Sequence, residues 1–146
     1  MRFALDESDE AQLFAHLQGA DADFMPPLSS RLDLVAYASK LAVRARRTEA
    51  WEDVKLVGLV AMYADDAIGG GFITNVSILP GYQRRGLAGQ LLKRTLDLAS
   101  ALGLPRVRLE VNADNFAART LYSRNNFRQA MPATAGSTLF LERVLR

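Results

Sequence analysis

A strand, a basic glycine-containing loop, a long helix and a second strand follow one another between residues 72 and 111. Residues 72–79 form an apolar run that Pro80 ends, and residues 107–111 alternate as a strand does. Between them, apolar residues recur at helical spacing: Leu87, Leu91, Leu92, Leu96, Leu98, Ala99 and Leu102. Because a strand–helix–strand crossover is right-handed and joins parallel strands, the sequence predicts a parallel pair inside an α/β sheet.

The loop that precedes this helix has the composition of an anion site. Arg84 and Arg85 add positive charge, and Gly86 and Gly89 leave room for close approach to the backbone. The first N–H groups of a helix have no partner within it and lie at the positive end of its dipole. We therefore expect residues 84–89 to hold a phosphate or pyrophosphate; a tight turn with solvated arginines is the alternative.

Two helices are expected before this unit. The first covers residues 6–18, with Leu13, Phe14 and Leu17 on its apolar face and Gly19 as its stop. The second is capped by Ser29 or Ser30 and fades between residues 41 and 47. Its expected inward residues are Leu32, Val35, Ala36 and Leu41.

Several short strands complete the expected sheet. They cover residues 48–52, 54–64, 127–130 and 138–144, and a further helix over 116–124 is capped by Asn115. The predicted fold class is α/β (α+β), a mixed sheet of about six or seven strands with helices on both faces. With 146 residues, the chain is expected to be a single domain over 1–146.

Composition excludes several classes of protein. There is no cysteine, so a disulfide framework, a thiolate nucleophile and a cysteine-ligated metal are impossible, and no metal site is expected. A net charge of +2 is too small to indicate nucleic-acid binding, and the cluster of Arg44, Arg46 and Arg47 is interpreted as a solvated helix end. No run has the length of a membrane span or the pattern of a signal peptide, which favours a cytoplasmic protein without a membrane partner.

A second motif follows about 30 residues after the loop. It reads Leu109-Glu110-Val111-Asn112, then Asn115-x-x-Ala118-x-x-Leu121-Tyr122, then Phe127. The first motif is Ile78-Leu79-Pro80 followed by Gln83-Arg84-Arg85-Gly86-Leu87-Ala88. Together they resemble the GNAT superfamily of acetyl-CoA-dependent N-acetyltransferases. Asn126 replaces the usual glycine of the family, a mild departure because asparagine tolerates a positive φ.

The resemblance implies an acetyl-CoA site. Its residues would be Ile78, Leu79, Gln83, Arg84, Arg85, Gly86, Leu87, Ala88, Gly89, Asn115 and Tyr122. The loop would bind the pyrophosphate, mostly through backbone N–H groups. The backbone at Ile78, beside a bulge in its strand, would pair with the pantetheine arm and stabilise the oxyanion. Asn115 would contact the pantetheine, and Tyr122 would protonate the leaving thiolate unless it is a buried structural tyrosine.

The general base is less well defined by the sequence. The acceptor amine must lose a proton before attack, and a carboxylate acting through water commonly helps. Glu49 is the preferred candidate among the carboxylates before the cofactor strand, which also include Glu52, Asp53, Asp65 and Asp66. Polar residues within that strand, Thr74, Asn75 and Ser77, are an alternative because they can orient a water. The single histidine, His16, is interpreted as a surface or edge residue.

The predicted function is transfer of an acetyl group from acetyl-CoA to a primary amine by direct attack in a ternary complex. Enzymes that acetylate ribosomal-protein N-termini typically carry a glutamate where this chain has Phe72, so a small-molecule acceptor is favoured. A protein N-terminus or lysine is the alternative acceptor. A non-catalytic acyl-CoA-binding regulatory module is the alternative of another class. A nucleotide-binding regulator is disfavoured because the loop lacks a lysine–serine pair. Dimers are common in the superfamily, so a homodimer is a further expectation.

Overall fold

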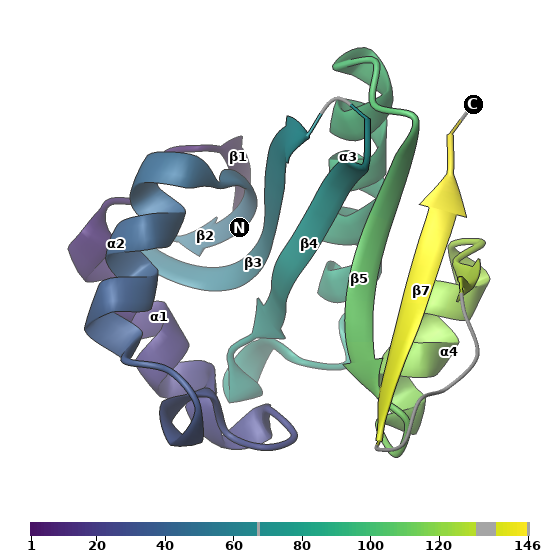
Figure 1. The fold of residues 1–146 in the computed structure, drawn as a ribbon. Coiled ribbons are helices and arrows are strands. Elements are labelled where there is room, and N and C mark those ends of the chain that lie inside the picture. The colour runs from purple at the N-terminus through teal and green to yellow at the C-terminus, as the bar shows by residue number, and fades with distance from the viewer. Residues whose placement is uncertain (67, 131–136, 146) are drawn as a thin grey trace.

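In the residues that the structure describes (1–66, 68–130 and 137–145 of a computed structural model), seven strands form one mixed sheet in the order β1-β2-β3-β4-β5-β7-β6 (Figure 1). The strands are β1 (Arg2–Leu5), β2 (Arg46–Glu52), β3 (Lys55–Asp66), β4 (Gly70–Ile78), β5 (Arg106–Asn112), β6 (Arg128–Gln129) and β7 (Thr138–Val144). Only the β4–β5 pair of this sheet is parallel. The predicted crossover and mixed sheet are confirmed.

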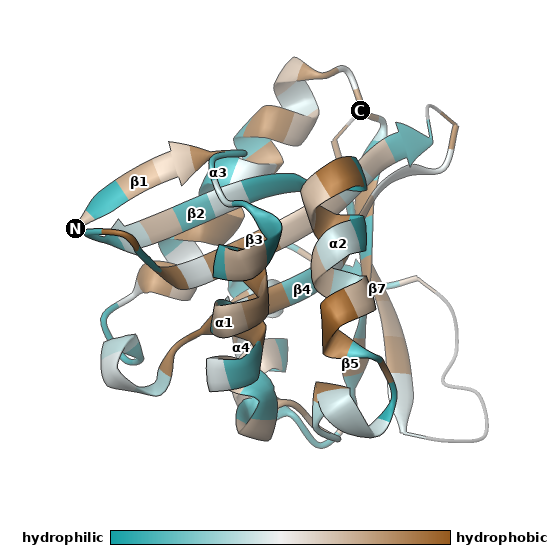
Figure 2. Ribbon diagram, turned by 90° about the vertical axis from the view of Figure 1, so that its left-hand side faces the viewer, coloured by the Kyte–Doolittle hydropathy of each residue, from teal (hydrophilic) through white to brown (hydrophobic). Residues whose placement is uncertain are grey.

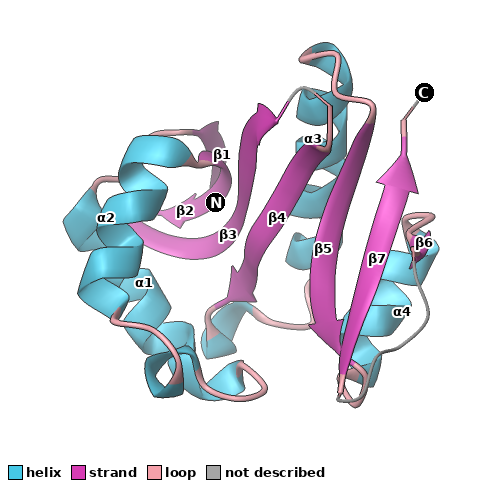
Figure 3. Cartoon of the chain, in the orientation of Figure 1, coloured by secondary structure: helices cyan, strands magenta, loops and turns pink. Residues whose placement is uncertain are grey.

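Four α-helices in the described residues cover the two faces of the sheet (Figure 3): α1 (Glu10–Ala20), α2 (Leu34–Arg44), α3 (Leu87–Ala101) and α4 (Phe116–Arg124). Figure 2 shows α1 and α2 side by side on one face. They enclose a core that includes Leu13, Leu17, Tyr37, Leu41, Trp51 and Leu59. On the other face α3 and α4 enclose a second core, with Leu91, Leu92, Tyr122 and Phe127.

The N-terminal segment differs from its prediction. Residues 2–5 are an edge strand, β1, and α1 begins only after Asp9. The Asp9 carboxylate accepts the Gln12 N–H at 2.8 Å, and the Gln12 side chain accepts the Asp9 N–H at 3.0 Å. This capping box sets the start of the helix at Glu10, rather than at the acidic residues from Asp6 onward. The helix also continues through Gly19 to Ala20.

The second helix also begins later than predicted, and a different face is buried. Asp33, rather than Ser29 or Ser30, caps α2 by accepting the N–H groups of Val35 (2.9 Å) and Ala36 (3.3 Å). Leu41 is buried as predicted, together with Tyr37 and Ala38, whereas Leu32, Val35 and Ala36 are exposed. The two serines precede the helix in a short 3-10 turn, η2 (Leu28–Ser30).

A bulge in β4 lies at the point where the β4–β5 ladder ends. Asn75 pairs with Ala61 of β3 and Ile73 pairs with Met62, so Thr74 is an extra residue in β4. The resemblance placed a bulge beside Ile78, which is wrong by this register. The parallel β4–β5 ladder ends at the pair Ile73–Leu109, directly before the bulge. Beyond this point the two strands diverge (Figure 1).

Arg47 is buried rather than solvated, with 4 % of its surface exposed. It lies 3.4 Å from Glu49 and donates to Ser8 O at 2.9 Å. The guanidinium also donates to carbonyl groups at and just after the end of α2, on Leu41, Ala42 and Ala45. The interpretation of this arginine as part of a solvated helix end is therefore wrong, because its donors close the C-terminus of α2.

Glu49 is completely buried beside this guanidinium. Its carboxylate accepts the backbone N–H groups of Glu7 (2.9 Å) and Ser8 (3.2 Å) and the indole N–H of Trp51 (3.3 Å). The Ser8 hydroxyl donates to it as well. Both carboxylate oxygens are thus occupied by the protein itself, which makes Glu49 a structural counter-ion.

Replacing Glu49 by Gln should destabilise the fold, because the Arg47 charge then stays buried without a counter-ion. We expect a loss of about 3 kcal/mol in the free energy of unfolding, measured by urea denaturation. The exposed Glu52→Gln is the matched control and should change stability by less than about 0.5 kcal/mol. Unchanged stability together with lost acetyl transfer would restore Glu49 as the general base.

Candidate active site

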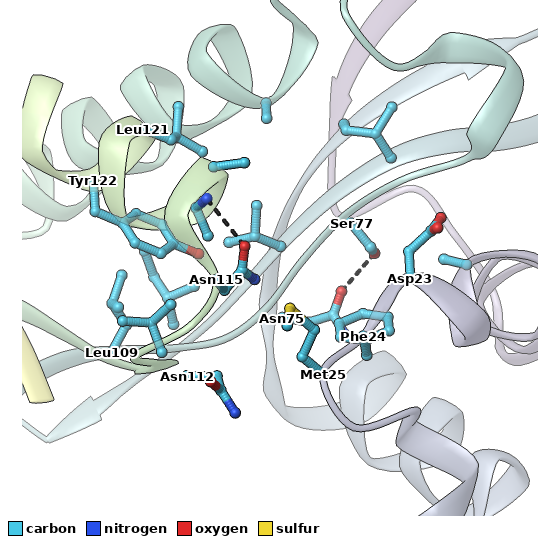
Figure 4. A pocket seen from close by; sticks show the side chains of 18 of the residues that line it. Asp23, Phe24, Met25, Asn75, Ser77, Leu109, Asn112, Asn115, Leu121 and Tyr122 are labelled. Carbon is cyan, nitrogen blue, oxygen red and sulfur yellow. Dashed lines mark hydrogen bonds between the residues drawn. The ribbon is translucent and has the colours of Figure 1, made fainter. Parts of the chain in front are cut away.

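A cavity of about 960 Å³ opens where β4 and β5 diverge (Figure 4). Its two long walls are residues 73–78 of β4 and residues 109–112 of β5, the latter continued by the start of α4. One end is formed by the loop and first turn of α3, residues 83–89. Residues from the segment 23–31, between α1 and α2, line it as well.

The β4 wall presents unpaired backbone groups. Leu79 N–H donates to Val57 O at 2.9 Å, so Leu79 and Val57 form a hydrogen-bonded pair of the β3–β4 ladder. In an antiparallel ladder such pairs alternate with pairs whose N–H and C=O groups point outward. The backbone groups of Val76 and Ile78 therefore point away from β3, toward the β5 side. Gln83 donates its amide to Ile78 O at 3.0 Å, which leaves the Ile78 N–H available.

The N-terminus of α3 faces the same cavity. Arg84 (φ 63°) and Gly86 (φ 75°) both adopt left-handed backbone conformations, and Gly86 is the N-cap of α3. The predicted residues that line this end are Gln83, Arg84, Gly86, Leu87, Ala88 and Gly89. Successive N–H groups in such a turn and the helix dipole both favour an anion here.

Two predicted cofactor residues lie outside this cavity. The Arg85 guanidinium donates to Gly81 O at 3.0 Å and lies over the ring of Tyr82. Leu79 is buried and packs next to Gly19, on the far side of the strand end. Neither side chain is among the cavity-lining groups.

Tyr122 and Asn115 come from α4 and meet in the cavity. Figure 4 shows the Tyr122 phenol pointing toward Asn115. Burial raises the pKa of Tyr122 to about 12, so the phenol keeps its proton at neutral pH. Asn115 is the N-cap of α4, and its Oδ1 accepts the Ala118 N–H at 3.2 Å. Asn126 has φ 65°, which confirms that asparagine takes the left-handed position of the family glycine.

Glu110 is a cavity residue that sequence reasoning missed. Among the described residues, Asp23 and Glu110 are the carboxylates that line the cavity. Asp23 accepts the Gln83 amide at 3.0 Å, whereas Glu110 is exposed and has no hydrogen bond or ion pair within the described chain. Glu110 is the first β5 residue after the last β4–β5 pair. Glu110 stands in the second motif, whereas the predicted candidates for the base were carboxylates before β4 and polar residues within it.

His16 is buried, with 1 % of its surface exposed, so its interpretation as a surface or edge residue is wrong. Its Nδ1 lies 2.9 Å from Leu56 O and its Nε2 lies 2.8 Å from the Ser77 hydroxyl. Burial lowers the pKa of His16 to about 4, so the ring is neutral at pH 7 and carries one N–H. Because a carbonyl oxygen only accepts, that proton belongs on Nδ1, and Nε2 accepts from Ser77.

This tautomer sets the direction of the neighbouring hydrogen bonds. The Ser77 hydroxyl has one proton and lies near two acceptors, His16 Nε2 and Asn75 Oδ1 (2.6 Å; Figure 4). The Asn75 amide can rotate by 180° with little change in shape, and its Nδ2 has no partner within the described chain. After rotation the amide donates to Ser77 and Ser77 donates to His16. His16 therefore ties α1 to the cofactor strand and has no free nitrogen for acid–base work.

The nitrogen-15 spectrum of His16 tests this arrangement without overlap, because the chain has one histidine. We expect a neutral ring protonated at Nδ1 and no titration above about pH 5. The unfolded ring has a pKa near 6.5, so stability should fall as the pH drops from 6.5 toward 4, by at most about 3 kcal/mol. A ring protonated at Nε2 at pH 7 would contradict the assigned direction.

The sequence model of the acetyltransferase (GNAT) family matches residues 15–127, and the chain belongs to this family. It is 35% identical over 96 residues to a mycothiol acetyltransferase of Beutenbergia cavernae, covering 58% of this chain and 32% of the relative. It is 39% identical over 56 residues to the [ribosomal protein bS18]-alanine N-acetyltransferase of Salmonella typhimurium, 38% of each chain. The chain thus spans about a third of the length of these curated relatives.

Solved structures share the whole fold. The ribosomal-protein-S18-alanine N-acetyltransferase of Escherichia coli has a TM-score of 0.74 at 23% identity, over 97% of this chain and 91% of that one. The PaiA N-acetyltransferase of Thermoplasma acidophilum, solved with coenzyme A, has a TM-score of 0.72 at 14% identity over 99% of both chains. These neighbours confirm the GNAT fold. No helix within the described residues is long and apolar enough to cross a membrane.

Proposed function

We propose that this protein is an N-acetyltransferase that binds acetyl-CoA in the β4–β5 cavity and transfers the acetyl group to a primary amine. One observation carries the proposal. A single cavity joins an unpaired β4 edge, the N-terminus of α3 and the protonated phenol of Tyr122. These are an extended-amide binding edge, an anion site and a proton donor, the three features that a CoA thioester requires.

The binding groups fit the parts of acetyl-CoA in order. The N–H groups at the start of α3 and the Arg84 side chain suit the pyrophosphate. The outward backbone groups of Val76 and Ile78 suit the amides of the pantetheine arm, as an added strand would. Asn115, opposite this edge, keeps its amide N–H₂ for the same arm. A fold neighbour was solved with coenzyme A, which supports this assignment.

The reaction needs no nucleophile from the protein. The acceptor ammonium first loses one proton, and we propose that the Glu110 carboxylate accepts it through a water, because Glu49 is buried away from the cavity. The amine nitrogen then attacks the thioester carbonyl carbon, and the outward N–H groups of β4 stabilise the negative charge on the carbonyl oxygen. The carbon–sulfur bond breaks, the thiolate takes the Tyr122 proton, and the second proton of the nitrogen passes through water to the tyrosinate.

The acceptor is proposed to be a small-molecule amine, because the match to the mycothiol enzyme is longer (96 residues) than that to the ribosomal-protein enzyme (56 residues). One relative is named for mycothiol and another for a ribosomal protein, so both acceptor classes occur among similar proteins. Phe72 pairs with Arg108 and is not among the cavity-lining residues, so its identity no longer favours one class. A protein N-terminus or lysine is the second candidate. A non-catalytic acyl-CoA-binding module is less well supported, because it requires neither the Tyr122 phenol nor a carboxylate at Glu110.

Gly86→Glu should abolish acetyl-CoA binding. The substitution puts a side chain on a residue with φ 75° and a negative charge at the proposed pyrophosphate site. We expect micromolar binding by the unaltered protein in titration calorimetry and no measurable binding by the variant. Gly81→Glu is the control, because a side chain there meets nothing within 4 Å and Gly81 does not line the cavity. Equal affinities for Gly86→Glu and the unaltered protein would refute the cofactor site.

Tyr122→Phe and Glu110→Gln should each lower kcat roughly a hundredfold or more and leave the acetyl-CoA Kd within about threefold. Thiol release from acetyl-CoA gives kcat, and calorimetry gives Kd. Tyr63→Phe is the matched control, since that phenol does not line the cavity. Unchanged kcat in Tyr122→Phe would make Tyr122 structural.

A further inference from the structure

Arg31 is an exposed cation in the cavity wall without a counter-ion. It follows η2 and is among the residues that line the cavity. The described part of the chain gives its guanidinium no hydrogen bond and no ion pair. A guanidinium has five N–H donors and no acceptor, so it is well suited to bind a carboxylate or phosphate group.

The nearby carboxylates are already engaged elsewhere. Asp21 accepts the backbone N–H of Ser29 at 2.8 Å and its hydroxyl at 2.6 Å. Asp23 accepts the Gln83 amide at 3.0 Å, and Asp33 caps α2. The charge of Arg31 is therefore left for something that enters the cavity.

Arg31 lines the same cavity as Thr74 and Glu110, the first residues of β4 and β5 after the parallel ladder ends. The Tyr37 phenol lies 2.7 Å from the hydroxyl of Thr74, the bulge residue. Burial raises the pKa of Tyr37 to about 12, so this phenol keeps its proton at neutral pH. The proposed pyrophosphate site, at the start of α3, follows the C-terminal end of β4.

Arg31 and Glu110 thus put opposite charges into the same cavity. Glu110 of β5 is the first residue beyond the last β4–β5 pair, and Thr74 of β4 occupies the matching position. The carboxylate of Glu110 suits an ammonium group, and the guanidinium of Arg31 suits an anion. A molecule that carries both groups matches this distribution better than a simple alkylamine.

We propose that the acceptor is an amine that also carries an anionic group, a carboxylate or a phosphate, and that Arg31 binds this group. The inference rests on the proposed acetyl transfer and adds the substrate class. Arg31 is then a specificity-determining residue. It acts on the acceptor and leaves acetyl-CoA binding unchanged.

The test compares matched amines that differ only in the anion. The pairs are L-alanine and L-alaninamide, β-alanine and β-alaninamide, 4-aminobutyrate and 4-aminobutyramide, and phosphoethanolamine and ethanolamine. We expect kcat/KM to be roughly ten- to hundredfold higher for the anionic member of at least one pair, as one charge-assisted contact provides. The carboxamides are less basic and hold more free amine at neutral pH, which works against this preference.

The Arg31 variants identify the source of the preference. Arg31→Gln should raise KM for the anionic amine at least tenfold. We expect little change in kcat, in KM for the neutral amine or in the acetyl-CoA Kd. Arg31→Lys should restore part of the preference, because it keeps the charge but loses the bidentate geometry. Arg44→Gln is the control, an exposed arginine outside the cavity that pairs with Asp65.

The possible outcomes separate the acceptor class, the role of Arg31 and acetyl-CoA binding. Transfer to neutral amines with equal or greater efficiency overturns the anionic acceptor and leaves acetyl transfer intact. Transfer to none of the anionic probes while acetyl-CoA binds also overturns it, because the pairs span several spacings. A tenfold weaker acetyl-CoA Kd in Arg31→Gln would assign Arg31 to the cofactor instead. Failure of the unaltered protein to bind acetyl-CoA refutes the proposed function itself.

Discussion

The parallel ladder between β4 and β5 ends at Ile73 and Leu109, where Thr74 adds one residue to β4. Hydrogen bonds that would continue the sheet are left unmade beyond this pair, and the outward groups of Val76 and Ile78 face a cavity. Backbone groups left unpaired in a protein interior carry a cost unless a partner replaces the missing strand. In the proposed function that partner is the amide-bearing arm of acetyl-CoA, so one interrupted ladder creates both the space and the binding edge.

Buried polar groups hold the walls of this cavity in place. His16 connects α1 to β3 and β4 through Leu56 and Ser77, and Arg47 with Glu49 connects the end of α2 to the strands below it. Their polar atoms form hydrogen bonds and ion pairs with other residues of the protein, so these side chains are structural rather than reactive. Glu110 and Arg31 differ from them, since each lines the cavity, as Arg84 and Arg124 also do, with a charge that has no ion pair among the described residues.

Reasoning from the sequence was accurate where the signal is local. The periodicity of α3, the left-handed position at Asn126 and the capping role of Asn115 depend on a few neighbouring residues. Reasoning was wrong where the partner is distant in the chain. The buried environment of Glu49 depends on Glu7 and Ser8, and that of His16 depends on Ser77. No spacing rule reveals such pairs, because a carboxylate on a strand looks the same whether it faces substrate or arginine.

The sequence by itself determined the crossover unit, the basic glycine-containing loop before α3 and the family, because each depends on contiguous residues with defined backbone preferences. Only the tertiary structure decided which polar side chains are free to act. It moved the candidate base from Glu49 to Glu110, and it excluded Arg85 and Leu79 from the cavity while bringing Arg31 into its wall. The physical reason is that reactivity depends on burial and on competing hydrogen bonds, and both arise from contacts between segments far apart in the chain.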